Sequence, residues 1–215
     1  VQPNTIVVLH NGAPVEMPFE GQCSAILEMF LAGTGGEEAA ARILCGLVNP
    51  SGKLAETVPY RLEDCPASDF NANPDVVTYH EGVFTGYRYY TTHDVPVRYP
   101  FGYGLSYTTF RQDGFSAAVE GLEIKVAATL TNTGSMAGSE VIQIYVTKPG
   151  NGPRRELAGF CKAWLDKGET KEIVIKIPLE RLCVYDTELK GFVLPEGEYI
   201  LTWYQMPVTK GFHKL

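Results

Sequence analysis

The hydrophobic pattern of the chain changes near residue 110, and this change limits the possible fold more than any other feature of the sequence. Before it, residues 5–9 (TIVVL) form a continuous β-branched run, typical of a strand that is covered on both faces in a parallel sheet. A second apolar run at 25–31 precedes a Gly-rich turn, and the apolar residues from Ala40 to Leu47 then fall on one helical stripe. The first half therefore predicts strand, turn and helix units of the α/β class.

After residue 110, apolar and polar residues alternate within short runs that Gly, Asn, Lys or Pro turns separate. A period of two indicates strands with one buried face, and several short strands without a helical pattern predict a β-sandwich. The runs that carry this pattern are 122–134, 139–147, 156–165, 171–179 and 197–204.

We therefore predict two domains, and a fold class of α/β plus all-β. Residues 1–108 should form a partial α/β sandwich with a mostly parallel sheet, and residues 109–215 a β-sandwich. A chain of 215 residues suits two domains, because single domains mostly contain about 100 to 150 residues. Within the first domain, the Pro-, Asp- and Asn-rich stretch 61–78 predicts a loop, and the ring-rich stretch 79–90 predicts an irregular extended segment.

The predicted boundary coincides with the stretch PFGYGLSYTTF at 100–110, which holds four aromatic rings and two glycines. Glycine lets the backbone turn sharply, and rings with a polar tip suit a partly hydrated joint between domains. We predict such a joint. The alternative is that rings such as Tyr103 stack on a sugar.

The charge of the chain argues against nucleic acid as a partner. A formal net charge of −7 and a pI of about 5.2 give a surface that repels phosphate polymers. The densest basic pair, Arg154 and Arg155, is expected in a loop. The sequence has no stretch of 18 apolar residues that could cross a bilayer, and we expect no membrane partner.

The cysteines and histidines predict neither a metal site nor a disulfide framework. Five cysteines are widely spaced and none forms a C-x-x-C pair, while the four histidines share no ligand spacing. Reduced thiols favour a reducing compartment, and the one candidate glycosylation acceptor, Asn49-Pro50-Ser51, is blocked by its proline. We expect a cytoplasmic protein without cofactor or metal; the first residues show no signal peptide, although a chain that opens almost directly on a strand pattern could be a piece of a longer one.

Two glycine motifs resemble nucleotide-binding loops and fail on detail. The third glycine of a G-x-G-x-x-G pattern that starts at Gly33 would fall on Glu38. In the segment from Gly46 to Lys53 the spacing is one residue too long, and Leu54 replaces the Ser or Thr that would hold magnesium.

Glu81 is the carboxylate with the strongest claim to a catalytic role on local grounds. Tyrosines surround it in YHEGVFTGYRYY, and aromatic neighbours can raise the pKa of an acid catalyst. A structural salt bridge with Arg88 is the favoured interpretation.

Several segments together resemble the C-terminal part of a glycoside hydrolase family 3 enzyme of the β-glucosidase type. They occur in the family's order and spacing over nearly the whole chain, and the most specific are NPSGKL, GYRYY and FGYGLSYT. The resemblance implies that residues 1–108 are the second half of an α/β sandwich and that residues 109–215 are a fibronectin type III-like domain. It also implies a (β/α)8 barrel elsewhere in the complete enzyme.

The family's retaining mechanism uses an Asp nucleophile from the barrel and a Glu acid/base from a Gly-Glu-Gly loop upstream of TIVVL. The Glu-Gly pairs of this chain, at Glu20, Glu81, Glu120 and Glu196, lack that context. We therefore assign no catalytic residue to this chain and leave its substrate-binding residues undefined.

The resulting functional prediction is a supporting part of a β-glucosidase, inactive as an isolated chain. Its expected partners are the polypeptide that carries the barrel with the rest of the α/β domain and, through the complete enzyme, a β-glucoside or oligosaccharide. The alternative is a free-standing carbohydrate-binding or interaction module that uses exposed aromatic rings.

Overall fold

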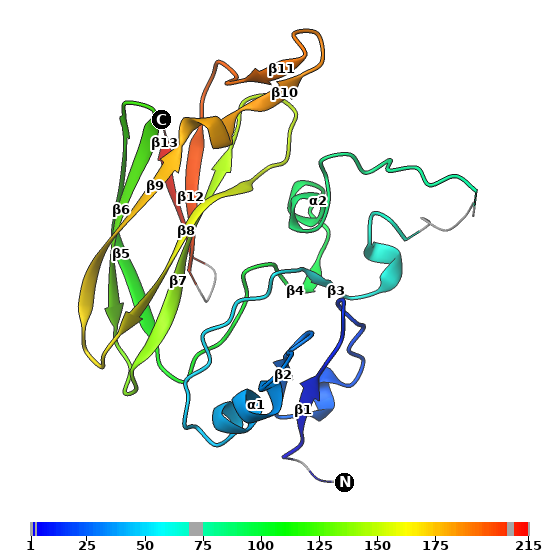
Figure 1. Ribbon diagram of the computed structural model, residues 1–215, viewed down its shortest axis with the longest axis vertical. Coiled ribbons are helices and arrows are strands. Elements are labelled where there is room, and N and C mark those ends of the chain that lie inside the picture. The colour runs from blue at the N-terminus through cyan, green and yellow to red at the C-terminus, as the bar shows by residue number, and fades with distance from the viewer. Residues whose placement is uncertain (1, 3, 69–74, 206–208, 215) are drawn as a thin grey trace.

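The computed structural model describes all residues except 1, 3, 69–74, 206–208 and 215. A region of short elements is followed by a sandwich of long strands, and the two lie side by side (Figure 1). The elements of the first region are β1 (Ile6–Leu9), β2 (Ala25–Glu28), α1 (Gly36–Leu44), β3 (Val58–Pro59), α2 (Tyr87–Thr92) and β4 (Val97–Tyr99), with short 3₁₀ helices at Glu20–Gln22 and Leu62–Asp64.

The first region contains the expected strand, turn and helix, in an open arrangement. β1 and β2 pair in parallel from Ile6 opposite Ala25 to Leu9 opposite Glu28, whereas β3 and β4 pair antiparallel. Parallel pairing is thus limited to β1 and β2 within the described part of the chain, and most of the sheet pairing is antiparallel.

The predicted burial of β1 on both faces is wrong for this chain. Ile6 is 48% exposed, and Leu47, predicted on the buried helical stripe, lies beyond the end of α1 and is 71% exposed. Gly46 has φ +70° at the end of α1, a conformation that stops a helix. The described residues do not cover these apolar side chains.

The structure corrects the prediction for 79–90, because the end of this stretch is helical. α2 begins after Gly86, whose φ of +52° is readily accessible to glycine. The hydroxyl of Thr91 donates to the carbonyl of Tyr87 one turn earlier at 2.7 Å, and Tyr90 is buried. Tertiary packing of the rings therefore outweighs the weak helix propensity of Tyr and Thr.

The second region is a sandwich of a four-stranded sheet, in the order β13-β12-β7-β8, and a three-stranded sheet, in the order β5-β6-β9. Each predicted strand run is confirmed, because each overlaps one of β6, β7, β8, β9 and β12. The strand bounds are β5 Phe110–Glu120, β6 Glu123–Asn132, β7 Gly138–Thr147, β8 Glu156–Leu165, β9 Thr170–Pro178, β12 Ile200–Gln205 and β13 Thr209–Lys214. A 3₁₀ helix (Leu179–Leu182) and a hairpin of β10 (Val184–Asp186) and β11 (Gly191–Val193) separate β9 from β12.

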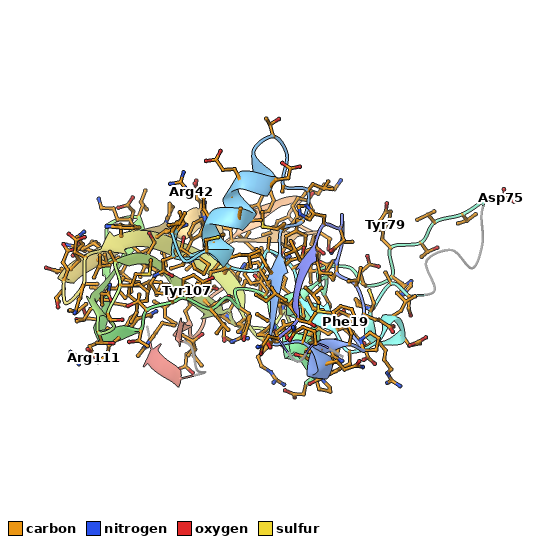
Figure 2. The ribbon with its side chains drawn as sticks, turned by 90° about the horizontal axis from the view of Figure 1, so that it is seen from below. Phe19, Arg42, Asp75, Tyr79, Tyr107 and Arg111 are labelled. Carbon is orange, nitrogen blue, oxygen red and sulfur yellow. The ribbon has the colours of Figure 1, made fainter. Side chains whose placement is uncertain are left out.

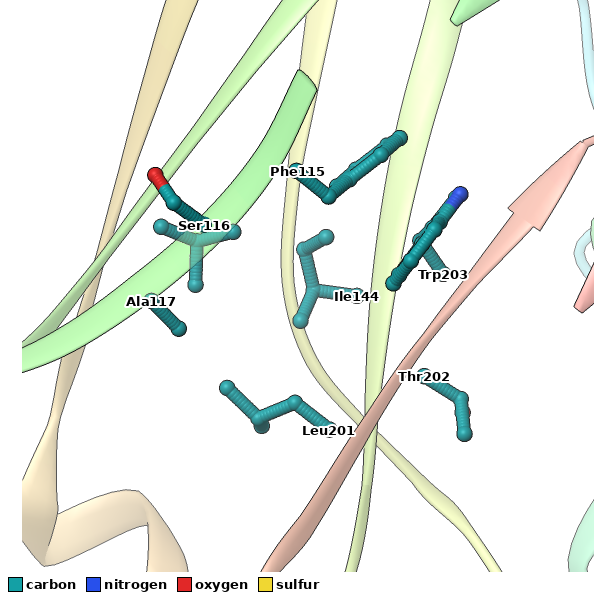
Figure 3. A pocket seen from close by; sticks show the side chains of 8 residues that line it. Phe115, Ser116, Ala117, Ile144, Leu201, Thr202 and Trp203 are labelled. Carbon is teal, nitrogen blue, oxygen red and sulfur yellow. The ribbon is translucent and has the colours of Figure 1, made fainter. Parts of the chain in front are cut away.

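The sandwich core consists of the inward-facing apolar side chains of both sheets. Alternation is clearest in β6, where Ile124, Val126, Ala128 and Leu130 are buried. Between β5 and β12, the Phe115 and Trp203 rings stack with centroids 4.0 Å apart. The crevice beside them, lined by both rings and Leu201 (Figure 3), has a volume of about 10 Å³, which is too small for a ligand.

Candidate functional site

The stretch 100–110 runs between the two regions and contacts both. A Cβ on Gly102 would lie 2.2 Å from Oε1 of Gln143 on β7, and a Cβ on Gly104 would lie 2.2 Å from the carbonyl oxygen of Gly52. A side chain at either position would collide with these atoms, and at Gly104 the neighbour is backbone, which cannot easily move away. We call this stretch, with the residues that contact it, the junction.

Asn49 is the central polar residue of the junction, and its side chain is buried. Its Oδ1 accepts hydrogen bonds from the Ser106 hydroxyl and the Tyr107 amide, both at 2.9 Å. Its Nδ2 donates to the carbonyl of Ala137 at 3.1 Å, in the turn before β7. One side chain therefore joins the end of α1, the linker and the sandwich.

Lys53 forms a second polar link from the same turn. Its Nζ donates to the carbonyl of Gly104 at 2.8 Å and lies 2.9 Å from Oε1 of Glu140 on β7. Both charged side chains are largely buried. Removing either partner would leave an uncompensated buried charge, so this pair fixes the relative position of the two regions.

Aromatic rings seal the other side of the junction. The Tyr87 ring stacks on Phe101 with centroids 4.6 Å apart and meets the Tyr145 ring edge-on at 6.0 Å. The Tyr87 hydroxyl accepts a hydrogen bond from the Leu157 amide at 2.8 Å. Nε2 of Gln143 donates to the carbonyl of Gly102 at 3.1 Å.

The four rings of the stretch are engaged in protein contacts. Phe101 stacks on Tyr87, and Tyr103 lies 5.1 Å from the Tyr99 ring. The Tyr107 hydroxyl donates to the carbonyl of Ile43 in α1 at 2.9 Å, and Phe110 packs on the sandwich core. The geometry thus favours the joint over the sugar platform.

The basic pair Arg154 and Arg155 also contributes to the contact between the regions. The Arg154 guanidinium pairs with Asp94 just after α2, with Nη2 2.7 Å from Oδ2, and this partner raises the pKa of Arg154. The Arg155 guanidinium lies over the Tyr145 ring, 5.1 Å from its centroid.

A second cluster lies where Glu20 meets β4. The Glu20 carboxylate pairs with the Arg98 guanidinium and accepts a hydrogen bond from the Tyr99 hydroxyl. Burial, followed by the bond to Glu20, raises the pKa of Tyr99. Glu20 is thus held by a cation and a phenol, as a structural carboxylate would be.

Glu81 lies at a cleft of about 590 Å³, which we call the Glu81 cleft. Side chains from 13–14, 55–67 and 81–90 line it, together with Phe101. Oε2 of Glu81 is buried and has no hydrogen-bond partner among the described residues. Arg88, the partner that the sequence favours, also lines the cleft, but its Nε lies 3.8 Å from Oε2 of Glu156.

Tyr90 is buried and also lines this cleft. Burial, and to a smaller extent interaction with the Cys65 thiol, raises the pKa of Tyr90. Its hydroxyl is therefore neutral at physiological pH and can act there only as an ordinary hydrogen-bonding group.

The remaining candidates stay apart from this cleft. Glu120 lies at the surface with its Oε1 3.6 Å from Nζ of Lys125, and Glu196 is exposed. Over the described ranges, no group of His, Cys, Asp and Glu is arranged to hold a metal ion, and the five thiols are free. No helix in these ranges is long and apolar enough to cross a membrane.

Two family models match the chain. The glycosyl hydrolase family 3 C-terminal domain matches residues 1–107, and the fibronectin type III-like domain matches residues 140–203.

The similar curated proteins are glycosidases. The chain is 40% identical over 209 residues to thermostable beta-glucosidase B of Acetivibrio thermocellus, covering 94% of this chain and 28% of that protein. It is 39% identical over 205 residues to an exo-alpha-(1->6)-L-arabinopyranosidase of Bifidobacterium longum, covering 92% of this chain and 27% of that protein.

Solved beta-glucosidases share the fold. DesR from Streptomyces venezuelae, solved with D-glucose, matches with a TM-score of 0.92 at 32% identity, over 99% of this chain and 29% of that chain. Beta-glucosidase 3B from Thermotoga neapolitana, solved with alpha-D-glucose, matches with a TM-score of 0.89 at 36% identity, over 97% and 31% of the two chains. The chain thus spans less than a third of the length of each of these four proteins.

Proposed function

The chain belongs to glycosyl hydrolase family 3, of which it forms a C-terminal portion, and from this premise we propose that it is the supporting part of a retaining β-glucosidase. In this proposal the complete protein hydrolyses terminal β-D-glucosyl residues. This chain completes the α/β sandwich and braces it with the fibronectin type III-like sandwich. The nucleophilic Asp and the acid/base Glu, held about 5 Å apart as retention requires, belong to polypeptide outside this chain.

The open first sheet is the observation that carries this proposal. β1 pairs only with β2 within the described residues, and its Ile6 is half exposed, as is Leu44 on α1. An unpaired strand edge beside exposed apolar side chains is unfavourable in water and is normally covered by another strand or helix. Polypeptide from the rest of a family 3 enzyme would supply that cover.

The junction supports the bracing role. Asn49, Lys53 and Tyr87 each bond or pair with the sandwich from the α/β side. A rigid link of this kind transmits the stability of the large sandwich core to the short elements beside it.

The substrate class in this proposal is inferred from the names of the relatives and not from residues of this chain. Relatives of nearly equal identity are named for a glucoside and for an arabinopyranoside. We therefore assign β-glucosides as the substrate class and expect the choice of sugar to depend on residues of the barrel.

An aryl β-glucoside assay tests the proposal directly. The isolated chain should release no aryl alcohol. A second polypeptide, comprising the part of thermostable beta-glucosidase B outside the alignment, should also be inactive alone and should gain turnover when this chain is added. Turnover by the isolated chain would refute the assignment of the catalytic carboxylates to other polypeptide and would make Glu81 the candidate catalytic residue.

A carbohydrate-binding module is the second candidate, because β8 carries two exposed rings. Phe160 and Trp164 are both more than half exposed on one face of this edge strand. Affinity electrophoresis on β-glucan separates the two candidates. Retardation that Trp164→Ala or Tyr103→Ala abolishes without loss of the fold would support the module, whereas unfolding of Tyr103→Ala without any retardation of the wild type would support the brace.

A further inference from the structure

Glu81 places a buried carboxylate oxygen at the edge of a cleft that the described residues do not fill. Its Oε2 has no hydrogen-bond donor among them. A buried carboxylate oxygen without a donor is unfavourable, so this arrangement is favourable only when something else supplies a donor. Arg88 on α2 also lines the cleft, but its Nε lies 3.8 Å from Oε2 of Glu156.

The segment 75–84, which we call the arm, leads into Glu81 and exposes apolar side chains. It extends away from the rest of the molecule, with Asp75 at its far end and Tyr79 closer to the body (Figure 2). Val76 and Val83 are each 58% exposed, and Val77 is 48% exposed. A ring nitrogen of His80 lies 3.2 Å from the carbonyl oxygen of Pro66, a residue of the cleft wall, so arm and cleft are continuous.

The combined surface fits a polypeptide better than a sugar. The cleft alone has the volume of a small-molecule site, but further apolar side chains, Val83, Val77 and Val76, are exposed on the arm. A single sugar ring could not cover both parts, and several exposed apolar side chains beside a cleft are typical of a protein interaction site.

We propose that the Glu81 cleft and the arm form the docking surface for the part of the family 3 enzyme that this chain lacks, and that a Lys or Arg side chain of that part pairs with Glu81. This inference rests on the proposed function. The matched proteins have nearly three quarters of their length outside the alignment, so a partner of sufficient size exists. A cation satisfies the buried carboxylate, and apolar side chains around it exclude water, as at the centre of a protein interface.

The test measures binding of this chain to the complementary part of thermostable beta-glucosidase B, produced as a separate polypeptide, by titration calorimetry. Glu81→Gln should raise the Kd by about 30-fold or more, because it leaves the partner's cation buried and unpaired. Val83→Ser should raise the Kd by about fivefold to tenfold. The matched control is Glu56→Gln, an exposed carboxylate that lines the same cleft, and it should change the Kd by less than about threefold.

A second readout separates docking from a role in the fold of this chain. Glu81→Gln should leave the thermal midpoint of the isolated chain unchanged or raise it, because the substitution removes a carboxylate whose buried Oε2 has no hydrogen-bond donor among the described residues. Each Lys and Arg residue of the partner is also changed singly to Gln. One of these substitutions should raise the Kd for the wild-type chain but have little effect on the Kd for Glu81→Gln.

The outcomes distinguish the inference from the proposed function. If the wild-type chain neither binds the partner nor gains turnover with it, both fall. If the wild type binds and Glu81→Gln stays within threefold of it, only the inference falls. Glu81-dependent binding of glucose or cellobiose by the isolated chain, or Glu81-dependent dimerisation in gel filtration, would overturn it in favour of a sugar or of a second copy.

Discussion

Truncation of Asn49 to alanine should markedly reduce the stability of the chain. The side chain makes three hydrogen bonds, to Ser106, Tyr107 and Ala137, at 2.9 to 3.1 Å. It is 7% exposed, so water does not readily replace it. The substitution leaves the partly buried Ser106 hydroxyl, the Tyr107 amide and the Ala137 carbonyl without this partner.

The magnitude follows from those three bonds. Each lost bond costs about 1 kcal/mol net, and each buried partner left unsatisfied can cost somewhat more. We expect a loss of about 3 kcal/mol in the free energy of unfolding. For a chain of this size, about 3 kcal/mol corresponds to a fall of roughly 6–12 °C in the thermal midpoint.

The assay is thermal and urea unfolding of wild type and Asn49→Ala, followed by circular dichroism and tryptophan fluorescence. Both tryptophans, Trp164 and Trp203, lie in the sandwich, so fluorescence reports on that region and circular dichroism on the whole chain. The matched control is Asn151→Ala in an exposed loop. A free-energy loss below about 0.5 kcal/mol for Asn49→Ala, the range of ordinary surface substitutions, would show that Asn49 does not hold the junction.

Two further predictions concern close approach and acid stability. Gly104→Ala should lower the free energy of unfolding by about 1–3 kcal/mol, because its Cβ would lie 2.2 Å from the Gly52 carbonyl oxygen. The control is Gly52→Ala, whose Cβ would have no heavy atom within 4 Å. Equal urea midpoints for the two variants would contradict the steric argument. A hydrogen bond from the Asp166 amide, and to a smaller extent one from Lys171, lowers the pKa of Glu169. The ionised carboxylate therefore stabilises the fold above the unfolded-state pKa of about 4.3, and this stabilisation is lost as the pH falls through the lower folded-state pKa. Glu169→Gln should therefore flatten the acid limb of a stability–pH curve, Glu172→Gln should leave it in place, and an unchanged limb in Glu169→Gln would rule out the contribution.

The sandwich was largely predictable because its strands are regular. Alternation in β6 places Ile124 through Leu130 toward the core, and every strand run read from the sequence is a strand in the structure. β5 was not predicted, since the register shifts between Asp113 and Ser116 around Gly114, with φ +65°, and interrupts the period of two.

The junction was predictable in position but not in chemistry. The ring-rich stretch 100–110 marked a joint, and NPSGKL at 49–54 is a family motif, yet nothing local assigned Asn49 or Lys53 a role in that joint. Their partners lie 57 to 88 residues away for Asn49 and 51 to 87 residues away for Lys53, so no short-range pattern records them. The domain boundary at residue 108 stays a prediction.

The sequence by itself determined five strands of the sandwich and the family to which the chain is related, because periodicity and motif order are properties of neighbouring residues. Only the tertiary structure decided that α2 is a helix, that Asn49 and Lys53 join the two regions, and that Oε2 of Glu81 lies at a cleft without a hydrogen-bond partner among the described residues. Those facts depend on contacts between residues that are distant in the sequence and on which polar atoms those contacts leave without a partner. Such contacts form only when the chain folds.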